Sequence, residues 1–288
     1  LPMDKKEEAD QMKRELAAGQ HSDHIALLRA YDGYQRAGDR RDYAWRHFLS
    51  ENTLRLMSDM RQQFRELLAD CGFLPGRHFS ECKDFNRHAD DFGLVKAVLC
   101  AGLYPNVVAV QSGKRKAKFR TREDGKVDAH PGSVNAWTGN FDGLQWLVYN
   151  EKVKSTGIYI RDSSAVPDLA LILFGGAVER AAAGVTMLKG CACPASLRLC
   201  SPLASHRFRS LFCAGVNFST SDGVAELVIG LRERLYELLQ AKIDEPSVDW
   251  IAASAELVDA VVRLLRGEDA HQQAARWGGF APADGMAQ

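Results

Sequence analysis

The chain has 288 residues, of which 46% are hydrophobic, so it has enough apolar material to bury a core in one large or two medium domains and is not a disordered chain. Its 37 basic and 37 acidic residues cancel, so the overall charge points to no partner. No apolar run reaches the ~18 residues of a membrane helix and no signal-peptide core is present, so the expected location is intracellular, in the nucleus or the cytoplasm, with no membrane partner.

Helical patterns fill the N-terminal part of the chain. Residues 22–37 place apolar side chains at helical spacing behind Ser22, which can act as an N-cap. Residues 51–71 repeat apolar side chains every three or four positions, and Ser50 can cap this second helix. The polar residues 75–91 are predicted to form a loop after this helical unit.

The spacing of apolar residues changes from helical to strand-like in the middle of the chain. After a short helix expected over 92–101, β-branched and alternating segments separated by turn residues predict five or six short strands, which suggests a small barrel. The strands are expected at 106–110, 114–122, 146–149, 157–160 and 169–174. A small barrel of this kind resembles an OB-fold.

The C-terminal part becomes helical again. Helices are expected over 224–243 and 255–265, and a disordered tail is expected from Gly267 onward. The expected fold class is therefore α+β, with an N-terminal helical unit, a small OB-fold-like antiparallel β-barrel and C-terminal helices.

The most informative motif is the basic segment GKRKAKFRTREDG at 113–125. Alternate residues of a strand point to one side at ~6.7 Å intervals, so one face of this strand is expected to be wholly basic. Such a face can follow the phosphates of an extended single strand, whereas the alternative is a charged edge strand that prevents aggregation; an OB-fold-like barrel favours binding. The cations are Lys114, Arg115, Lys116, Lys118, Arg120 and Arg122.

Aromatic residues of the barrel region are candidates for base stacking. Trp137 and Tyr159 lie near polar turns and remain candidates, whereas Trp146 and Tyr149 lie in an apolar strand and are expected in the core.

Catalytic motifs are missing from the sequence. It contains no G-x-x-x-x-G-K-[ST] loop, no acidic box for Mg²⁺, no H-E-x-x-H and no G-x-S-x-G pattern. The histidine pairs, His21 with His24 and His78 with His88, lack ligand-spaced partners and are expected to be solvated or capping. We therefore predict no catalytic residue, cofactor or metal ligand in this chain.

Six collinear blocks of the sequence are similar to one family. They are SDHIALLRAYDGY from Ser22, FLSENTLRLMSDMRQQFRELLADCGF from Phe48, VKAVLCAGLYPNV from Val95, DAHPGSVNA from Asp128, WLVYNEKVKSTGIYIRDSSAV from Trp146 and LILFGG from Leu171, and the helix VAELVIGLRERLYELLQAKI extends the match to about residue 265. The sequence resembles the C-terminal region of DEAH-box/RNA helicase A-type helicases, in the plant-like or G-quadruplex-associated branch.

The resemblance implies three regions. Residues 1–90 correspond to the end of the helicase-associated helical (ratchet) domain, 91–243 to the OB-fold domain with an insertion at 191–217, and 244–288 to a terminal helix and tail. The winged-helix domain and the RecA-like domains, which use ATP and Mg²⁺ in such enzymes, have no counterpart here. The chain, which begins at Leu1, is therefore expected to be part of a longer parent that carries the ATPase.

The resemblance also implies partners and RNA-facing groups. The partners are single-stranded or structured RNA, with DNA or a G-quadruplex as alternatives, and the parent's upstream domains. The alternative function is a protein-interaction module that docks onto the helicase core or an adaptor with little RNA affinity. Besides the basic segment, the implied RNA-facing residues are the turn at His130, Ser133 and Asn135 and the loop at Lys152, Lys154, Ser155 and Thr156.

One segment is unusually rich in cysteine. In the family, residues like 186–190 lead almost directly into residues like 218–221, so 191–217 is expected to interrupt one barrel strand. We rank a translated intron or gene-model error first and a surface loop second. A zinc site ranks third because its spacing fits no common finger; its ligands would be Cys191, Cys193, Cys200 and Cys213, with His206 as an alternative. The other cysteines, Cys71, Cys82 and Cys100, are expected to be reduced thiols.

Overall fold

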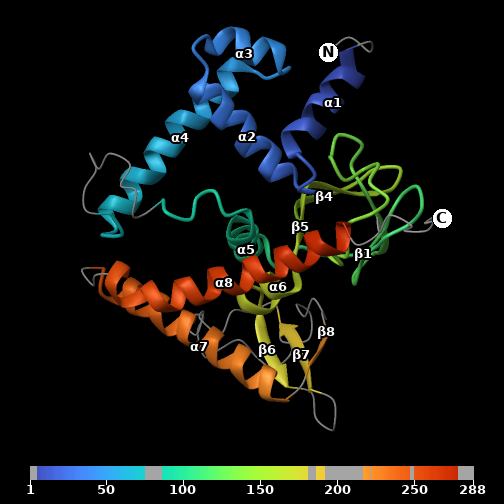
Figure 1. Cartoon of the computed structure of the whole chain (residues 1–288). Coiled ribbons are helices and arrows are strands. Elements are labelled where there is room, and N and C mark those ends of the chain that lie inside the picture. Colours follow the sequence, from blue (N-terminus) through green and yellow to red (C-terminus); the bar gives the residue numbers. More distant parts are fainter. Residues whose placement is uncertain are drawn as a thin grey trace, which may run out of the picture.

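The computed structural model describes residues 5–74, 86–180, 186–191, 217–220, 222–246 and 250–277. A helical unit forms its N-terminal part, at the top of Figure 1. Its helices are α1 (Lys6–Ala17), α2 (Asp23–Arg36), α3 (Arg40–Arg46) and α4 (Glu51–Asp70). The helices predicted over 22–37 and 51–71 are confirmed as α2 and α4.

The predicted N-caps are confirmed as well. The Ser22 hydroxyl accepts a hydrogen bond from the Ile25 N–H at 3.0 Å, and the Ser50 hydroxyl accepts one from the Thr53 N–H at 3.3 Å. The sequence analysis missed α1 and α3. Of the α1 side chains only Ala17 is buried, and α3 has only 7 residues.

The middle of the chain is a closed barrel of five strands in the order β1-β2-β3-β5-β4, preceded by α5 (Phe92–Leu103). Neighbouring strands are antiparallel except β3 and β5, which pair in parallel. The strands are β1 (Val107–Gln111), β2 (Lys118–Thr121), β3 (Gly125–Ala129), β4 (Trp146–Lys154) and β5 (Ile158–Val166). The predicted α+β class and small barrel are thereby confirmed.

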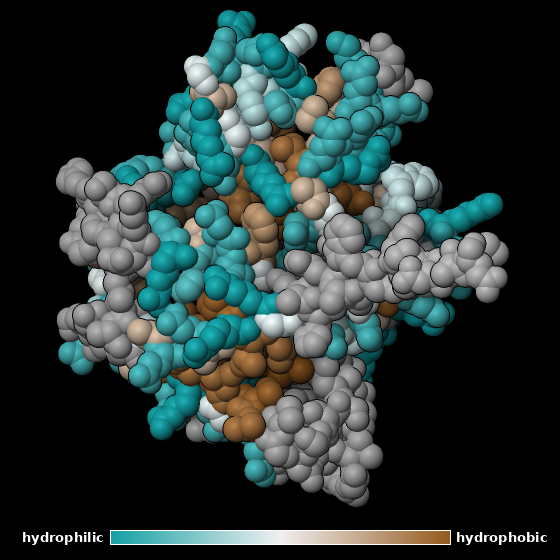
Figure 2. All heavy atoms as spheres, in the orientation of Figure 1, coloured by the Kyte–Doolittle hydropathy of each residue, from teal (hydrophilic) through white to brown (hydrophobic). Residues whose placement is uncertain are grey.

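Two groups of apolar side chains pack the barrel and the C-terminal helices, and a third lies within the helical unit. One fills the barrel and includes Val108, Phe119, Val127, Leu147 and Ile160. The other packs one side of the barrel against α5 and the C-terminal helices; its buried members include Ala97, Val148, Leu171 and Leu265, with Trp146 partly buried against it. Figure 2 shows apolar side chains gathered in the lower half of the molecule, where these C-terminal elements lie. The core position predicted for Tyr149 is confirmed, since this side chain is buried in the barrel, whereas Trp146 is only partly buried.

The strand predicted over 169–174 is wrong, because these residues form α6 (Asp168–Phe174). A short run of apolar residues fits a buried strand and a buried helix equally well. Pro167 stands at the N-cap, and Ala170, Leu171, Ile172 and Leu173 are all buried. The run packs as a helix against α5 rather than adding a strand to the barrel.

Two further helices and a second, antiparallel sheet in the order β6-β7-β8 complete the described chain. The strands are β6 (Ala177–Arg180), β7 (Thr186–Cys191) and β8 (Asn217–Thr220), and the helices are α7 (Asp222–Asp244) and α8 (Trp250–Trp277). The disordered tail predicted from Gly267 is wrong up to Trp277, because α8 continues through these residues. Within the described ranges, no helix combines the length and the apolar character that crossing a membrane requires.

The hypothesis that 186–190 and 218–221 are halves of one barrel strand is also wrong. Residues 186–190 lie on β7 and residues 218–220 on β8, and the two strands pair with each other so that Leu188 stands opposite Phe218. The barrel closes without either strand. Cys82, Cys193, Cys200, Cys213, His78 and His206 lie outside the described residues, and so does most of the suggested insertion. Cys71 and Cys100 are free thiols, and burial raises the pKa of Cys100 to about 12, so this thiol stays protonated.

Candidate nucleic-acid interface

The basic segment forms the outer face of a β-hairpin made by β2 and β3. Ala117, Phe119 and Thr121 are buried, and the cations between them point to solvent. The regular strand covers only Lys118–Thr121, because the N–H groups of Gly113 and Ala117 donate to the carbonyls of Gly139 and Thr138 instead of to a strand. Lys114 and Arg115 are therefore exposed on a loop, and Lys116, Lys118, Arg120 and Arg122 are exposed along the hairpin.

The hairpin brings a further cation to this face, Lys126 of β3, which stands directly opposite Arg120. Both side chains are exposed, and within the described part of the chain neither makes an ion pair. Like charges directly opposite each other destabilise a strand pair. The sequence analysis missed Lys126, although the Asp124-Gly125 pair that follows the alternating segment is a hairpin signal. Gly125 has a φ of +69°, as such a turn requires.

The predicted loop at 152–156 lies beside the end of this hairpin. The Lys152 ammonium donates a hydrogen bond to the Asp124 carboxylate in the β2–β3 turn. This hydrogen bond lowers the pKa of Asp124 and raises the pKa of Lys152, so both groups stay charged. Lys154, Ser155 and Thr156 are exposed at the turn between β4 and β5. The structure thus brings the two predicted basic elements together.

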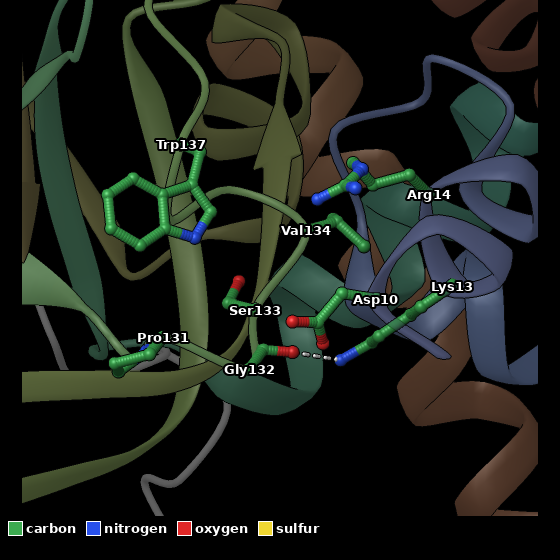
Figure 3. Close-up of a pocket in the computed structure, with 8 residues that line it drawn as sticks. All are labelled: Asp10, Lys13, Arg14, Pro131, Gly132, Ser133, Val134 and Trp137. Carbon is green, nitrogen blue, oxygen red and sulfur yellow. Dashed lines mark hydrogen bonds between the residues drawn. The ribbon is translucent and has the colours of Figure 1, made fainter. Parts of the chain in front are cut away.

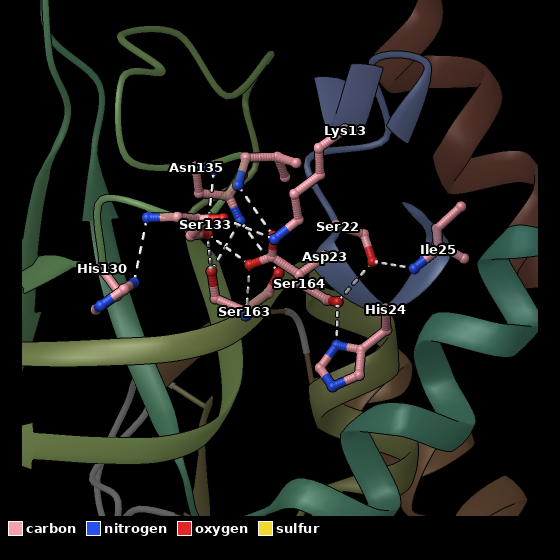
Figure 4. A network of polar contacts seen from close by, with 12 residues as sticks. Lys13, Ser22, Asp23, His24, Ile25, His130, Ser133, Asn135, Ser163 and Ser164 are labelled. Carbon is pink, nitrogen blue, oxygen red and sulfur yellow. Dashed lines mark hydrogen bonds and ion pairs between the residues drawn. The ribbon is translucent and has the colours of Figure 1, made fainter. Parts of the chain in front are cut away.

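Two of the three predicted polar side chains of the turn at 130–135 are buried. Ser133 and Asn135 are buried, and both belong to a hydrogen-bond network between the helical unit and the barrel (Figure 4). The Asn135 amide donates to the Ser163 hydroxyl at 2.9 Å and to the His21 carbonyl at 3.2 Å. In this structure both residues therefore join parts of the chain and present no surface to RNA. His130 is half-buried, and its Nδ1 accepts a hydrogen bond from the Gly132 N–H at 3.1 Å.

The centre of this network is Asp23 at the start of α2, whose side chain is fully buried. Its carboxylate accepts hydrogen bonds from the Ser133 hydroxyl at 2.5 Å, the Val134 N–H at 2.9 Å and the Ser163 N–H at 3.0 Å. Lys13 of α1 completes the set with an ion pair at 2.9 Å. The network fixes the 131–137 turn of the barrel on the helical unit.

His24 adds a pH-sensitive contact at the same junction. Its Nδ1 lies 2.7 Å from the Ser164 hydroxyl. Burial lowers the pKa of His24 below 6.5, and the charges of Asp23 and Asp162 only partly oppose this effect.

The lowered pKa gives a prediction for stability against pH. The unfolded chain binds the second imidazole proton of His24 more readily than the folded chain does. The contribution of His24 to stability is therefore constant above the unfolded pKa of 6.5 and falls as the pH drops below it. Replacing His24 with Gln keeps hydrogen-bonding groups and removes the titration, so we expect a smaller loss of urea midpoint between about pH 7.5 and pH 5.5 than in the wild type. An equal loss in both proteins would show that His24 does not contribute.

A small cleft separates α1 from the 131–137 turn (Figure 3). Asp10, Lys13 and Arg14 line it from α1. From the barrel it is lined by Pro131, Gly132, Ser133, Val134 and Trp137. Lys13 spans it and donates to the Gly132 carbonyl at 2.7 Å. Trp137 stands at its mouth with 67% of its surface exposed. Tyr159, the other stacking candidate, is half-buried and packs edge-on against the His130 ring.

Metal ligation finds no support in the part of the chain that the structure describes. Within those ranges, no three His, Cys, Asp or Glu side chains are grouped so that they could hold an ion. His21 instead lies 3.1 Å from the Asp142 carboxylate.

Comparisons with known protein families match the barrel region and the C-terminal helices. Residues 95–178 match the oligonucleotide/oligosaccharide-binding (OB)-fold family, and residues 215–267 match the C-terminal domain in RNA helicases. Over 93% of its length the chain is 43% identical to the DExH-box ATP-dependent RNA helicase DExH1 of Arabidopsis thaliana and 33% identical to the ATP-dependent DNA/RNA helicase DHX36 of Mus musculus. It is 35% identical over 92% of its length to the putative ATP-dependent RNA helicase DHX57 of Homo sapiens.

The chain spans only part of these relatives. It covers 25% of DExH1, 26% of DHX36 and 20% of DHX57.

Proposed function

We propose, from the premise that this chain is the OB-fold and C-terminal region of a DExH-box RNA helicase, that it grips single-stranded RNA on the outer face of the β2–β3 hairpin. We call Lys118, Arg120 and Lys126 the cation ribbon. In the parent protein, the grip couples RNA to a RecA-type motor that uses ATP and Mg²⁺. Structured RNA and DNA are further substrates of the same surface, and the nucleus and the cytoplasm are the expected locations.

One observation carries this proposal, the opposed Arg120 and Lys126 side chains without a counter-ion in the described residues. Such a pair costs stability in the free protein, and a phosphate between the two cations removes that cost. Lys118 lies two residues along the same face, at a distance of ~6.7 Å that suits successive phosphates. The Lys116–Asp128 ion pair of 2.9 Å and the Lys152–Asp124 pair show that neighbouring cations are already neutralised.

Replacing the three ribbon residues with alanine is expected to weaken single-stranded RNA binding and to flatten its salt dependence. Each phosphate contact contributes about 0.7 to the slope of log affinity against log salt for single strands, so the slope is expected to fall by about 2. Fluorescence anisotropy titrations of a labelled oligouridylate at several salt concentrations measure this slope.

A charge-matched variant controls for the loss of positive charge. Lys6, Arg41 and Arg263 are exposed cations away from the ribbon, and their triple replacement changes the net charge equally. This variant is expected to keep the wild-type slope. If both triple variants lose the same slope, the ribbon has no special part in binding.

A second candidate function is supported by α4. One side of this helix exposes large apolar side chains, namely Met57, Phe64, Leu67 and Leu68. Phe64 is 57% exposed. This side suits an interaction module that docks onto the helicase core or an adaptor. Under this alternative the chain has little RNA affinity, so the same titration at low salt separates the two functions.

A further inference from the structure

We propose that Trp137 stacks on a nucleobase at the mouth of the cleft beside α1, and that Arg14 binds a phosphate next to that base. The inference rests on the proposed function, since it adds a base site to the phosphate-binding ribbon. It also places one nucleotide between the helical unit and the barrel.

Trp137 lies beside the start of β2, the strand that carries Lys118 and Arg120. Two backbone hydrogen bonds, Gly113 N–H to the Gly139 carbonyl at 2.9 Å and Ala117 N–H to the Thr138 carbonyl at 3.0 Å, hold its segment beside the basic loop. The Lys116 ammonium lies 5.9 Å from the centre of the indole ring. A strand of nucleic acid that follows the ribbon therefore reaches Trp137 without leaving the protein surface.

The turn that carries Trp137 is rigid before any ligand binds. Asp23 holds Ser133 and Val134 through the hydrogen bonds described above, and the Thr138 hydroxyl donates to the Val134 carbonyl at 3.1 Å. Stacking normally costs the conformational entropy of the residue that carries the ring. Part of that cost is absent here, because the backbone of Trp137 is already fixed. The burial of so much of the turn makes the 67% exposure of Trp137 unusual for so large an apolar side chain.

Charges around the cleft favour a base at its mouth, on Trp137, and a phosphate at its α1 edge. Lys13 is committed to Asp23 and the Gly132 carbonyl, so it is not available to a phosphate. Asp10 lies in the cleft, where its carboxylate repels phosphate and accepts hydrogen bonds from base N–H groups. Arg14 is exposed on the α1 side and lines the cleft, whereas Lys116 on the ribbon side is already paired with Asp128 at 2.9 Å. Figure 3 shows Trp137 and Arg14 on opposite sides of the turn.

The test compares two oligomers of equal length, an oligouridylate and an abasic ribose-phosphate chain. Base stacking is lost in the second, whereas the phosphate contacts remain. For Trp137→Ala, we expect about tenfold weaker binding of the oligouridylate, an unchanged salt slope, and unchanged binding of the abasic chain. Trp137→Phe is expected to retain most of the affinity because phenylalanine also presents an aromatic face.

Trp45 provides the matched control, since it is another exposed tryptophan, on α3, with 76% of its surface accessible. Trp45→Ala is expected to bind both oligomers as the wild type does. Quenching of tryptophan fluorescence by the oligouridylate is expected in the wild type and in Trp45→Ala, and to be largely absent in Trp137→Phe.

The outcomes separate this inference from the proposed function. If the wild type binds both oligomers with a steep salt slope and Trp137→Ala binds the oligouridylate equally well, the base site is refuted and the ribbon proposal stands. If the wild type binds neither oligomer at low salt, the proposed function fails and the base site fails with it.

Discussion

Replacing Asp23 with asparagine is expected to lower the free energy of unfolding by about 3 kcal/mol, although the side chain keeps its shape. The fully buried carboxylate accepts from three donors of the barrel and pairs with Lys13. Asparagine has one acceptor oxygen, and its NH₂ group meets a donor where Asp23 had an oxygen. At least one buried N–H then loses its partner, and the Lys13 ammonium loses its counter-ion.

The size of this effect follows from the exposure of the two partners. Breaking a fully buried ion pair costs about 3 to 5 kcal/mol. The Lys13 side chain is 31% exposed, so water partly replaces the lost carboxylate, and the lower end of that range is expected. Asp59 on α4 is exposed, and Asp59→Asn should change the stability by less than about 0.5 kcal/mol.

Urea denaturation of the wild type and both variants measures the difference. We also expect the Asp23 variant to lose part of the fluorescence quenching by the oligouridylate, because the turn that carries Trp137 is no longer fixed. Equal urea midpoints for Asp23→Asn and Asp59→Asn would mean that the network contributes no net stability.

Local signals in the sequence were sufficient for the features that depend on neighbouring residues. The caps Ser22 and Ser50 begin α2 and α4 as expected, because an N-cap hydrogen bond spans only three residues. The alternating pattern around Phe119 correctly placed Lys118 and Arg120 on the outside, because the inward residues are apolar and the barrel buries them.

Features that depend on distant parts of the chain were not predictable from such signals. Lys126 joins the ribbon only through the register of β3 on β2. Ser133 is buried because Asp23, 110 residues earlier, lies against it, and no local pattern marks that contact. The helical state of 168–174 was missed for the same reason, since α5, α7 and α8 supply the apolar surface that this segment covers. The polar turn at 130–135 is thus also a junction between the barrel and the helical unit, which no local pattern indicates.

The junction between the two matched families depends on Arg232 of α7, and its replacement with alanine is expected to cost about 3 kcal/mol. Its guanidinium donates to the Ile172 carbonyl at 2.5 Å and to the Gly175 carbonyl at 2.6 Å, at the C-terminal end of α6. Helix C-terminal carbonyls lack partners within the helix, and a cation there also interacts favourably with the helix dipole. Burial lowers the pKa of Arg232, but arginine remains charged at neutral pH.

Two neighbouring substitutions make this prediction specific. Arg232→Lys keeps the charge but cannot donate in a planar fork to two carbonyls, so an intermediate loss is expected. Arg234 lies on the same helix, is 76% exposed and pairs with Glu237, so Arg234→Ala should cost less than about 0.5 kcal/mol. Urea denaturation gives the stabilities, and hydrogen exchange of α6 amides shows whether that helix opens first. Equal costs for the alanine variants of Arg232 and Arg234 would contradict the role of Arg232. Because α6 also packs on α5 beside the barrel, loss of Arg232 is expected to loosen the C-terminal helices without affecting the RNA binding that we propose for the cation ribbon.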